Sequence, residues 1–158
     1  MGTKRVGLAR TQALIENLKR ELQMNTSTLK GTKVEVVSLT GAGATTTLTA
    51  ENGGAIVKMG GSNASTVTLP TVAAGLKFRF VATTAHAHVI TGGATVIQGG
   101  YHHNTNGATV ARVAVTDKTT LTLHSSNPLI GDTLEMWSDG TNWYVSGIVN
   151  DVITQAAE

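Results

Sequence analysis

The chain has 158 residues and a mass of 16.3 kDa, which fits one domain with a hydrophobic core and excludes two full-sized domains. Only 14% of the residues are charged and 4% are aromatic, whereas 26 are threonine and 18 are glycine. This composition is typical of many short strands joined by tight turns. The absence of cysteine excludes disulfides, thiolate metal sites and a cysteine nucleophile.

Charge is distributed unevenly along the chain. The net charge is +2, but residues 1–35 hold seven basic and three acidic residues, and the remainder holds five basic and seven acidic ones. No apolar run reaches the roughly 18 residues of a membrane span, and residues 1–10 lead into a polar segment rather than an apolar signal core. We therefore expect a protein made in the cytoplasm that has no membrane partner and whose two parts face different environments.

A helix is predicted over residues 8–24, because apolar side chains recur there at helical spacing. They form one stripe: Leu8, Leu14, Ile15, Leu18 and Leu22. The polar run 25–28 and Gly31 end the helix, which places a domain boundary near residue 30. A helix of this length is marginal alone in water. The helix must therefore dock, either on its own β domain or on a neighbouring subunit. We interpret residues 1–30 as an attachment arm in which the stripe and Arg10 dock on a partner.

Residues 31–158 are predicted to form a β domain, because short apolar or alternating runs end there at Gly, Asn, Asp or Pro. The clearest run is 76–82, in which Phe78 and Phe80 share a core face and Lys77 and Arg79 share the other. The predicted strands are 33–39, 45–50, 55–59, 65–69, 76–83, 87–91, 94–98, 109–115, 119–124, 132–138 and 142–149. The fold class expected is mainly β, an antiparallel β-sandwich or jelly-roll-like barrel with one N-terminal α-helix. No repeat of fixed period is found, which disfavours a solenoid.

The sequence lacks the motifs of common catalytic and nucleotide sites. The glycine-rich segment 41–44 has no third glycine of a dinucleotide fingerprint and no Walker lysine. The seven acidic residues after residue 35 are spread through the predicted loops rather than paired. We therefore predict that the chain is not an enzyme and carries no cofactor. Carboxylates that converge across a subunit interface are the arrangement that would revive an enzymatic reading.

Two histidines, His86 and His88, are predicted to lie on one face of a strand. Two such ligands make half a metal site, and a strand at the axis of a trimer would bring six imidazole nitrogens to one ion. The alternative is a polar turn whose histidines make local hydrogen bonds. We predict no metal site and keep the pair His86 and His88 as the alternative.

Three aromatic residues, Trp137, Trp143 and Tyr144, flank a predicted hairpin turn at 139–140. They could form a contact surface for sugars, since aromatic faces stack on the apolar faces of pyranose rings. Packing in the core is the competing interpretation, and the alternation of side chains implies that at least one of the two tryptophans is buried.

The basic N-terminal segment also admits a nucleic-acid interpretation, in which lysine and arginine contact phosphates. Glu16 and Glu21 interrupt the basic patch, and the segment holds no aromatic residue on which a base could stack. We therefore predict a protein partner and no nucleic-acid partner.

Four segments of the β domain carry a recognisable pattern: residues 66–70 (TVTLP), 74–81 (AGLKFRFV), 88–91 (HVIT) and 131–147 (GDTLEMWSDGTNWYVSG). Together they resemble the small β-rich virion proteins of tailed bacteriophages. The segment 4–22 (KRVGLARTQALIENLKREL) is similar to the N-terminal helix on structural proteins of marine phages.

The resemblance implies a capsid decoration (cement) protein, a homotrimer on the outer surface of the capsid that binds the major capsid protein. The hairpin segment 138–145 also recurs in tail-fibre and receptor-binding modules. The alternative function is therefore a tail-fibre or head-fibre adsorption module that binds carbohydrate on the host surface.

Overall fold

A computed structural model of the chain describes residues 7, 10–18, 34–105, 109–123 and 129–157. It divides into two compact units, Met1–Val34 and Glu35–Glu158. In the first unit residues 10–18 are helical, and the Thr11 hydroxyl donates a hydrogen bond to the Gly7 carbonyl at 2.7 Å. The rest of the predicted helix and the predicted boundary at residue 30 lie outside the described residues.

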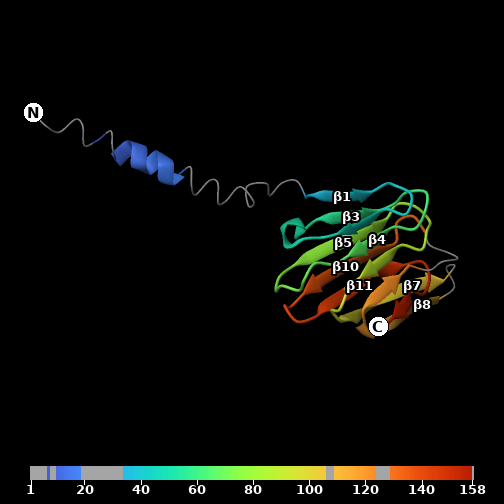
Figure 1. Cartoon of the computed structure of the whole chain (residues 1–158). Helices are drawn as coiled ribbons and strands as arrows, with labels where there is room; N and C mark the ends of the chain where they lie inside the picture. The colour runs from blue at the N-terminus through green and yellow to red at the C-terminus, as the bar shows by residue number, and fades with distance from the viewer. Residues whose placement is uncertain (1–6, 8–9, 19–33, 106–108, 124–128, 158) are drawn as a thin grey trace, which may run out of the picture. The chain divides into compact units, whose positions relative to one another are not determined.

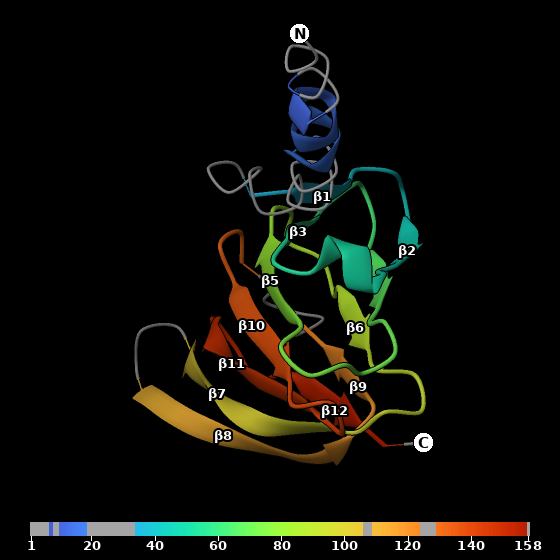
Figure 2. The same ribbon diagram turned by 90° about the vertical axis from the view of Figure 1, so that its left-hand side faces the viewer.

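The second unit consists of two facing β-sheets (Figures 1 and 2). The larger sheet has the order β1 (Val36–Leu39), β3 (Ile56–Met59), β5 (Lys77–Ala82), β10 (Thr133–Ser138), β11 (Trp143–Val149), β7 (Ile97–Thr105), β8 (Thr109–Lys118). The smaller sheet has the order β12 (Thr154–Ala156), β9 (Thr120–Thr122), β6 (Val89–Thr91), β4 (Thr66–Thr68), β2 (Thr45–Thr47). A short 3-10 helix, η1 (Ala50–Asn52), follows β2. The predicted mainly β fold of sandwich type, with one N-terminal helix, is confirmed.

Both sheets are mixed rather than purely antiparallel, because the first six strands alternate between them. The chain passes from β1 to β2, back to β3, across to β4, and on to β5 and β6, so that strands within each sheet run parallel. Residues 20 apart pair between β1 and β3, as in Val36 with Ile56, and residues 21 apart pair between β2 and β4, as in Thr45 with Thr66. The next turn spans 23 residues.

This winding is a structural repeat, although the sequence has no repeat of fixed period. Each turn of the coil carries one strand for each sheet, and a stacked coil of this kind has a repeat of about 20 residues. The period drifts from 20 to 23 residues, and the strands of each turn differ in sequence. A search for identical residues at one fixed spacing therefore misses it.

All eleven predicted strands overlap observed ones, and two details differ. The strand predicted over 94–98 begins at Ile97 and continues to Thr105, because Gly99 and Gly100 extend it instead of turning it. A Cβ on Gly99, whose φ is 120°, would collide with the Val145 carbonyl of the neighbouring strand. The final strand, β12, was not predicted, because its residues Thr154–Ala156 (TQA) include no large apolar side chain and none is buried.

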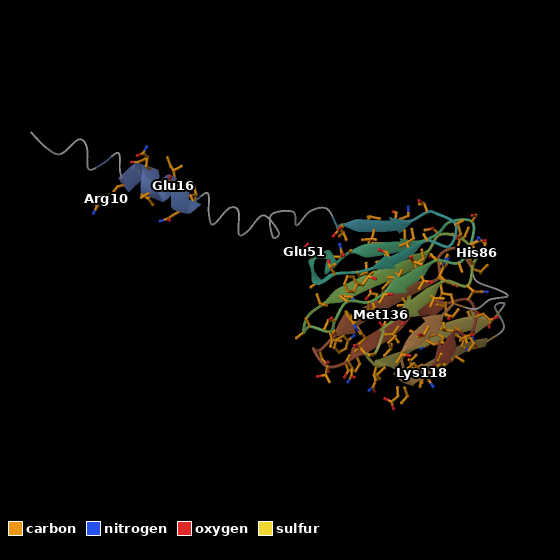
Figure 3. The ribbon with its side chains drawn as sticks, viewed as in Figure 1. Arg10, Glu16, Glu51, His86, Lys118 and Met136 are labelled. Atoms are coloured by element: carbon orange, nitrogen blue, oxygen red, sulfur yellow. The ribbon has the colours of Figure 1, made fainter. Side chains whose placement is uncertain are left out.

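The core lies between the sheets and follows the period of two along each strand. In β5 the side chains of Phe78 and Phe80 are buried, while Lys77 and Arg79 point outward, as predicted. Trp143 on β11 packs against Phe78 with ring centroids 5.8 Å apart. Met136 occupies the buried face of β10 between them in sheet order (Figure 3). Adjacent strands of the larger sheet, β5, β10 and β11, therefore pack Phe78, Met136 and Trp143 side by side in the core.

Hydrogen bonds tie the C-terminal segment to the larger sheet. The Tyr101 hydroxyl of β7 is buried and accepts a hydrogen bond from the backbone N–H of Ile153 at 2.8 Å. Farther along, the Gln155 side-chain amide of β12 donates to the Ala114 carbonyl of β8 at 3.2 Å. Figure 2 shows β8 and β12 side by side at this end of the sandwich. The last strand therefore links the two layers at their β8–β12 edge.

A bulge in β8 gives a test of this backbone geometry. Ile97 pairs with Lys118 and Gly99 with Val115, so β8 has one extra residue there, and Asp117 takes a φ of 51°. Among the residues that the structure describes, Asp117 is the one non-glycine residue with a positive φ.

We predict that Asp117→Gly raises the free energy of unfolding by about 1 kcal/mol, and that Asp117→Val lowers it by about 1–2 kcal/mol, because a β-branched side chain is strained at positive φ. Chemical denaturation measures both changes. The matched control is Thr116→Gly in the same bulge, which lowers stability because Thr116 has no positive φ for glycine to relieve and glycine increases the entropy of the unfolded chain. Equal effects of glycine at positions 116 and 117 would contradict the assignment of the bulge.

Candidate functional site

The described part of the N-terminal helix carries an exposed apolar stripe. The side chains of Leu14, Ile15 and Leu18 are 69%, 49% and 58% exposed. They lie one and four residues apart, which places them on the same side of a helix. Arg10 and Glu16 also extend outward from the helix (Figure 3). The other two members of the predicted stripe, Leu8 and Leu22, lie outside the described residues.

The two tryptophans have opposite environments, as the alternation of side chains requires. Trp143 is completely buried, so it does not belong to the predicted aromatic contact surface. Its position on the inner face of β11 aims it at Phe78, and its indole N–H has no hydrogen-bond partner in the described part of the chain. Trp137, on the outer face of β10, is 46% exposed.

Trp137 and Tyr144 form a stacked pair on the outer face of the larger sheet. They are direct cross-strand partners in the β10–β11 hairpin, with ring centroids 4.4 Å apart and ring planes inclined by 18°. Cross-strand aromatic pairs of this kind stabilise a hairpin. The predicted contact surface is therefore reduced to Trp137 and Tyr144.

The turn between these strands holds the tyrosine in place. One Asp139 carboxylate oxygen accepts hydrogen bonds from the Thr141 and Asn142 amides at 2.7 and 2.9 Å, and the other accepts one from the Tyr144 hydroxyl at 3.0 Å. The Asn142 and Thr141 amides, followed by the Tyr144 hydroxyl, lower the pKa of Asp139 because they stabilise the carboxylate. Gly140 completes the turn with a φ of 99°.

Polar side chains flank the aromatic pair. The strand registers place Lys77, Trp137, Tyr144 and Gln98 in one row across four strands. The Lys77 ammonium is 3.1 Å from the Glu135 carboxylate of β10, and both side chains are substantially exposed. Sequence patterning gave the outward direction of Lys77, but Glu135 and Gln98 were missed as members of the site. The order of the strands brings them together, and that order is not visible in local patterns.

The histidine pair does not form the metal site considered as an alternative. His86 lies in a bend and His88 precedes β6, with ring centroids 6.1 Å apart and perpendicular planes. His88 is fully buried, and both of its ring nitrogens have partners. The Ser65 amide donates to Nδ1 at 3.0 Å, and Nε2 lies 3.1 Å from the Thr84 carbonyl. The amide donor assigns the lone pair to Nδ1 and the proton to Nε2.

A neutral His88 bonded in this way is a structural element. Burial lowers its pKa, more strongly than the hydrogen bond to Thr84 raises it. In the described residues, no group of three or more His, Asp or Glu side chains is placed to hold a metal ion.

One buried carboxylate connects two loops. Asp132 accepts hydrogen bonds from the Leu129 amide at 3.2 Å and the Asn150 amide at 2.9 Å, so it joins the start of β10 to the end of β11. Burial raises its pKa, and these two amides oppose the shift. These contacts give Asp132 a structural role, since it holds two loops together at one end of the sandwich.

Comparison with protein-family models, curated proteins and solved structures finds no match for this chain. Over the described residues, the structure contains no helix with the length and apolar character needed to cross a membrane.

The buried His88 predicts a loss of stability in mild acid. Its pKa is lower in the folded chain than the ordinary value of 6.5, so the unfolded chain takes up the proton first. Its contribution is therefore complete above about pH 6.5 and is lost as the pH falls, by at most about 1.4 kcal/mol per pH unit.

Urea denaturation at a series of pH values measures this loss. His88→Gln is expected to be less stable at neutral pH and to show a smaller decline between neutral pH and pH 5. The control is His102→Gln, which leaves the bonds between His88 and Ser65 intact and retains the decline. An unchanged pH dependence in His88→Gln would refute this role of His88.

Proposed function

We propose that the chain is a non-catalytic capsid decoration protein of a tailed bacteriophage, which binds the major capsid protein lattice from outside and stabilises the head. The observation that carries the proposal is the exposed apolar stripe Leu14, Ile15 and Leu18 on a helix that precedes a β domain with its own core. Large apolar side chains on one face of a helix that is marginal alone are a surface for binding a partner.

In the proposed mechanism, the N-terminal helix attaches the protein to the capsid and the β domain forms the rigid body. The helix is too short to be stable alone, so docking of its apolar face and folding of the arm occur together. The excess of basic residues in 1–35 favours an acidic surface on the partner and accelerates encounter. We propose that the β domains associate as a homotrimer, so that three arms act together and weak single contacts become a persistent attachment.

The β domain suits the role of a rigid body on the capsid. Its core joins side chains from both sheets, and the C-terminal segment links the layers through Tyr101 and Ile153. Such a domain needs neither a metal nor a disulfide to hold its shape while the arm binds. Decoration stabilises a shell because a protein that binds only the assembled lattice shifts the equilibrium toward that lattice.

The alternative function is an adsorption module of a tail or head fibre that binds host carbohydrate. It is favoured by the 46% exposure of Trp137 beside Tyr144 on the outer sheet face. In that case, attachment through the arm is retained and the β domain becomes the distal binding element.

The proposal predicts that the apolar stripe carries the attachment. Capsid shells of the phage that encodes the chain, freed of accessory proteins, are mixed with the full-length protein and sedimented. The wild-type chain is expected to co-sediment at a saturable ratio. The variant Leu14→Gln, Ile15→Gln, Leu18→Gln is expected to bind at least tenfold more weakly, because each buried aliphatic side chain contributes about 1.5–3 kcal/mol.

A matched control substitutes the opposite side of the same helix. The variant Ala13→Gln, Glu16→Gln is expected to co-sediment like the wild type. Failure of the wild-type chain to bind the shells, or equal binding by the stripe variant, would overturn the proposed function.

A further inference from the structure

We propose that the outer face of β5, β10 and β11 binds a neutral hexopyranose, with its apolar C–H face on the indole of Trp137 and its hydroxyls on Lys77 and Glu135. The inference goes beyond capsid attachment and does not depend on it; it rests on the same exposed aromatic pair as the alternative function and names the ligand class and the groups that bind it. It rests on the position of one aromatic face among matched donors and acceptors.

Tyr144 lies against one face of the Trp137 indole, with ring centroids 4.4 Å apart and the rings nearly parallel. Trp137 nevertheless keeps 46% of its surface exposed. On the side away from Tyr144, its cross-strand partner is Lys77 of β5, so a ligand that stacks there meets the Lys77 side chain.

The aromatic pair is fixed before any ligand arrives. The Tyr144 hydroxyl is held by Asp139, and two backbone amides hold that carboxylate in turn. Stacking on a positioned tyrosine restricts the rotamers of Trp137. A ring that is already oriented loses little conformational entropy when a ligand stacks on it, which favours the binding of a small ligand.

Hydrogen-bonding groups lie beside Trp137: Lys77 is its partner on β5, and Glu135 precedes it by two residues on β10. The Lys77 ammonium and the Glu135 carboxylate pair at 3.1 Å, with side chains 58% and 41% exposed, so both retain unfilled bonding capacity toward solvent. Glu135 also faces Arg79 on β5 and Ser146 on β11 in the strand register. Donors and acceptors therefore alternate within one side-chain length of the aromatic face.

This combination favours a sugar over other ligands that stack. A pyranose presents C–H groups on one face and hydroxyls, which both donate and accept, around its edge. The two charges nearest Trp137, the Lys77 ammonium and the Glu135 carboxylate, pair with each other, which matches a neutral ligand, while Arg79 lies two residues beyond Lys77 on β5 and leaves one positive charge at the edge of the surface. A nucleotide would require a positive surface for its phosphate, and a cationic ligand would meet the Lys77 ammonium.

Indole N–H signals in two-dimensional NMR of the full-length protein test the inference. The probes are methyl β-glucopyranoside, methyl β-galactopyranoside and N-acetylglucosamine, each titrated to millimolar concentration. With at least one of them, the Trp137 signal is expected to shift saturably. The signal of Trp143, which is completely buried, stays in place and reports an intact core.

Variants assign the contacts. Trp137→Leu is expected to weaken binding at least tenfold, measured by saturation-transfer NMR on the sugar, and to leave the Trp143 signal unchanged. Lys77→Met and Glu135→Gln are each expected to weaken binding severalfold. The control is Ile148→Ala, which removes another exposed apolar side chain of β11 and retains full affinity.

Three results would overturn the proposal. They are the absence of a saturable shift with every sugar, undiminished binding by Trp137→Leu, and tighter binding of adenosine than of any sugar at the same signal. Capsid co-sedimentation of Trp137→Leu is expected to equal that of the wild type. The failure of one proposal is thereby distinguishable from the failure of the other.

Discussion

Burial of two inner sheet faces against each other is the constraint from which the rest of the β domain follows. Each strand that contributes Phe78, Met136 or Trp143 to the interior must turn its alternate residues outward. The same period of two that fills the core therefore decides that Lys77, Glu135 and Tyr144 line the outer face. The candidate binding surface is in this sense a geometric consequence of core packing, and its spacing is set by the distance between adjacent strands.

Local patterns were sufficient for some of this architecture. The run 76–82 and the hairpin around Asp139 and Gly140 were predicted with correct facing, because alternation and turn chemistry are properties of neighbouring residues. The exposed part of the helical stripe was predicted for the same reason. The alternation of side chains along the hairpin strands predicted that one tryptophan is buried. It did not predict that Trp143 is the buried one, because that depends on which face of the hairpin packs against the second sheet.

The parts that were missed depend on contacts between residues distant in sequence. Parallel pairing at intervals of 20 to 23 residues is produced by crossing between sheets, and no single strand contains a sign of it. The pairing of His88 with Ser65 spans 23 positions, so the histidines were grouped by their spacing rather than by their true partners. Lys77 and Glu135 are separated by 58 positions and meet because β10 pairs with β5.

The strand order also has a consequence for synthesis of the chain. In the larger sheet, β10 and β11 lie between β5 and β7. In the sequence, however, β10 and β11 begin only at Thr133 and Trp143, after both β5 and β7. While the chain emerges from the ribosome, one edge of β5 therefore stays unpaired, because its partner strand β10 is translated more than 50 residues later. Phe78 and Phe80 lie on this strand. The coil formed by β1 to β6 can assemble early, whereas the sheet becomes continuous only near the end of translation.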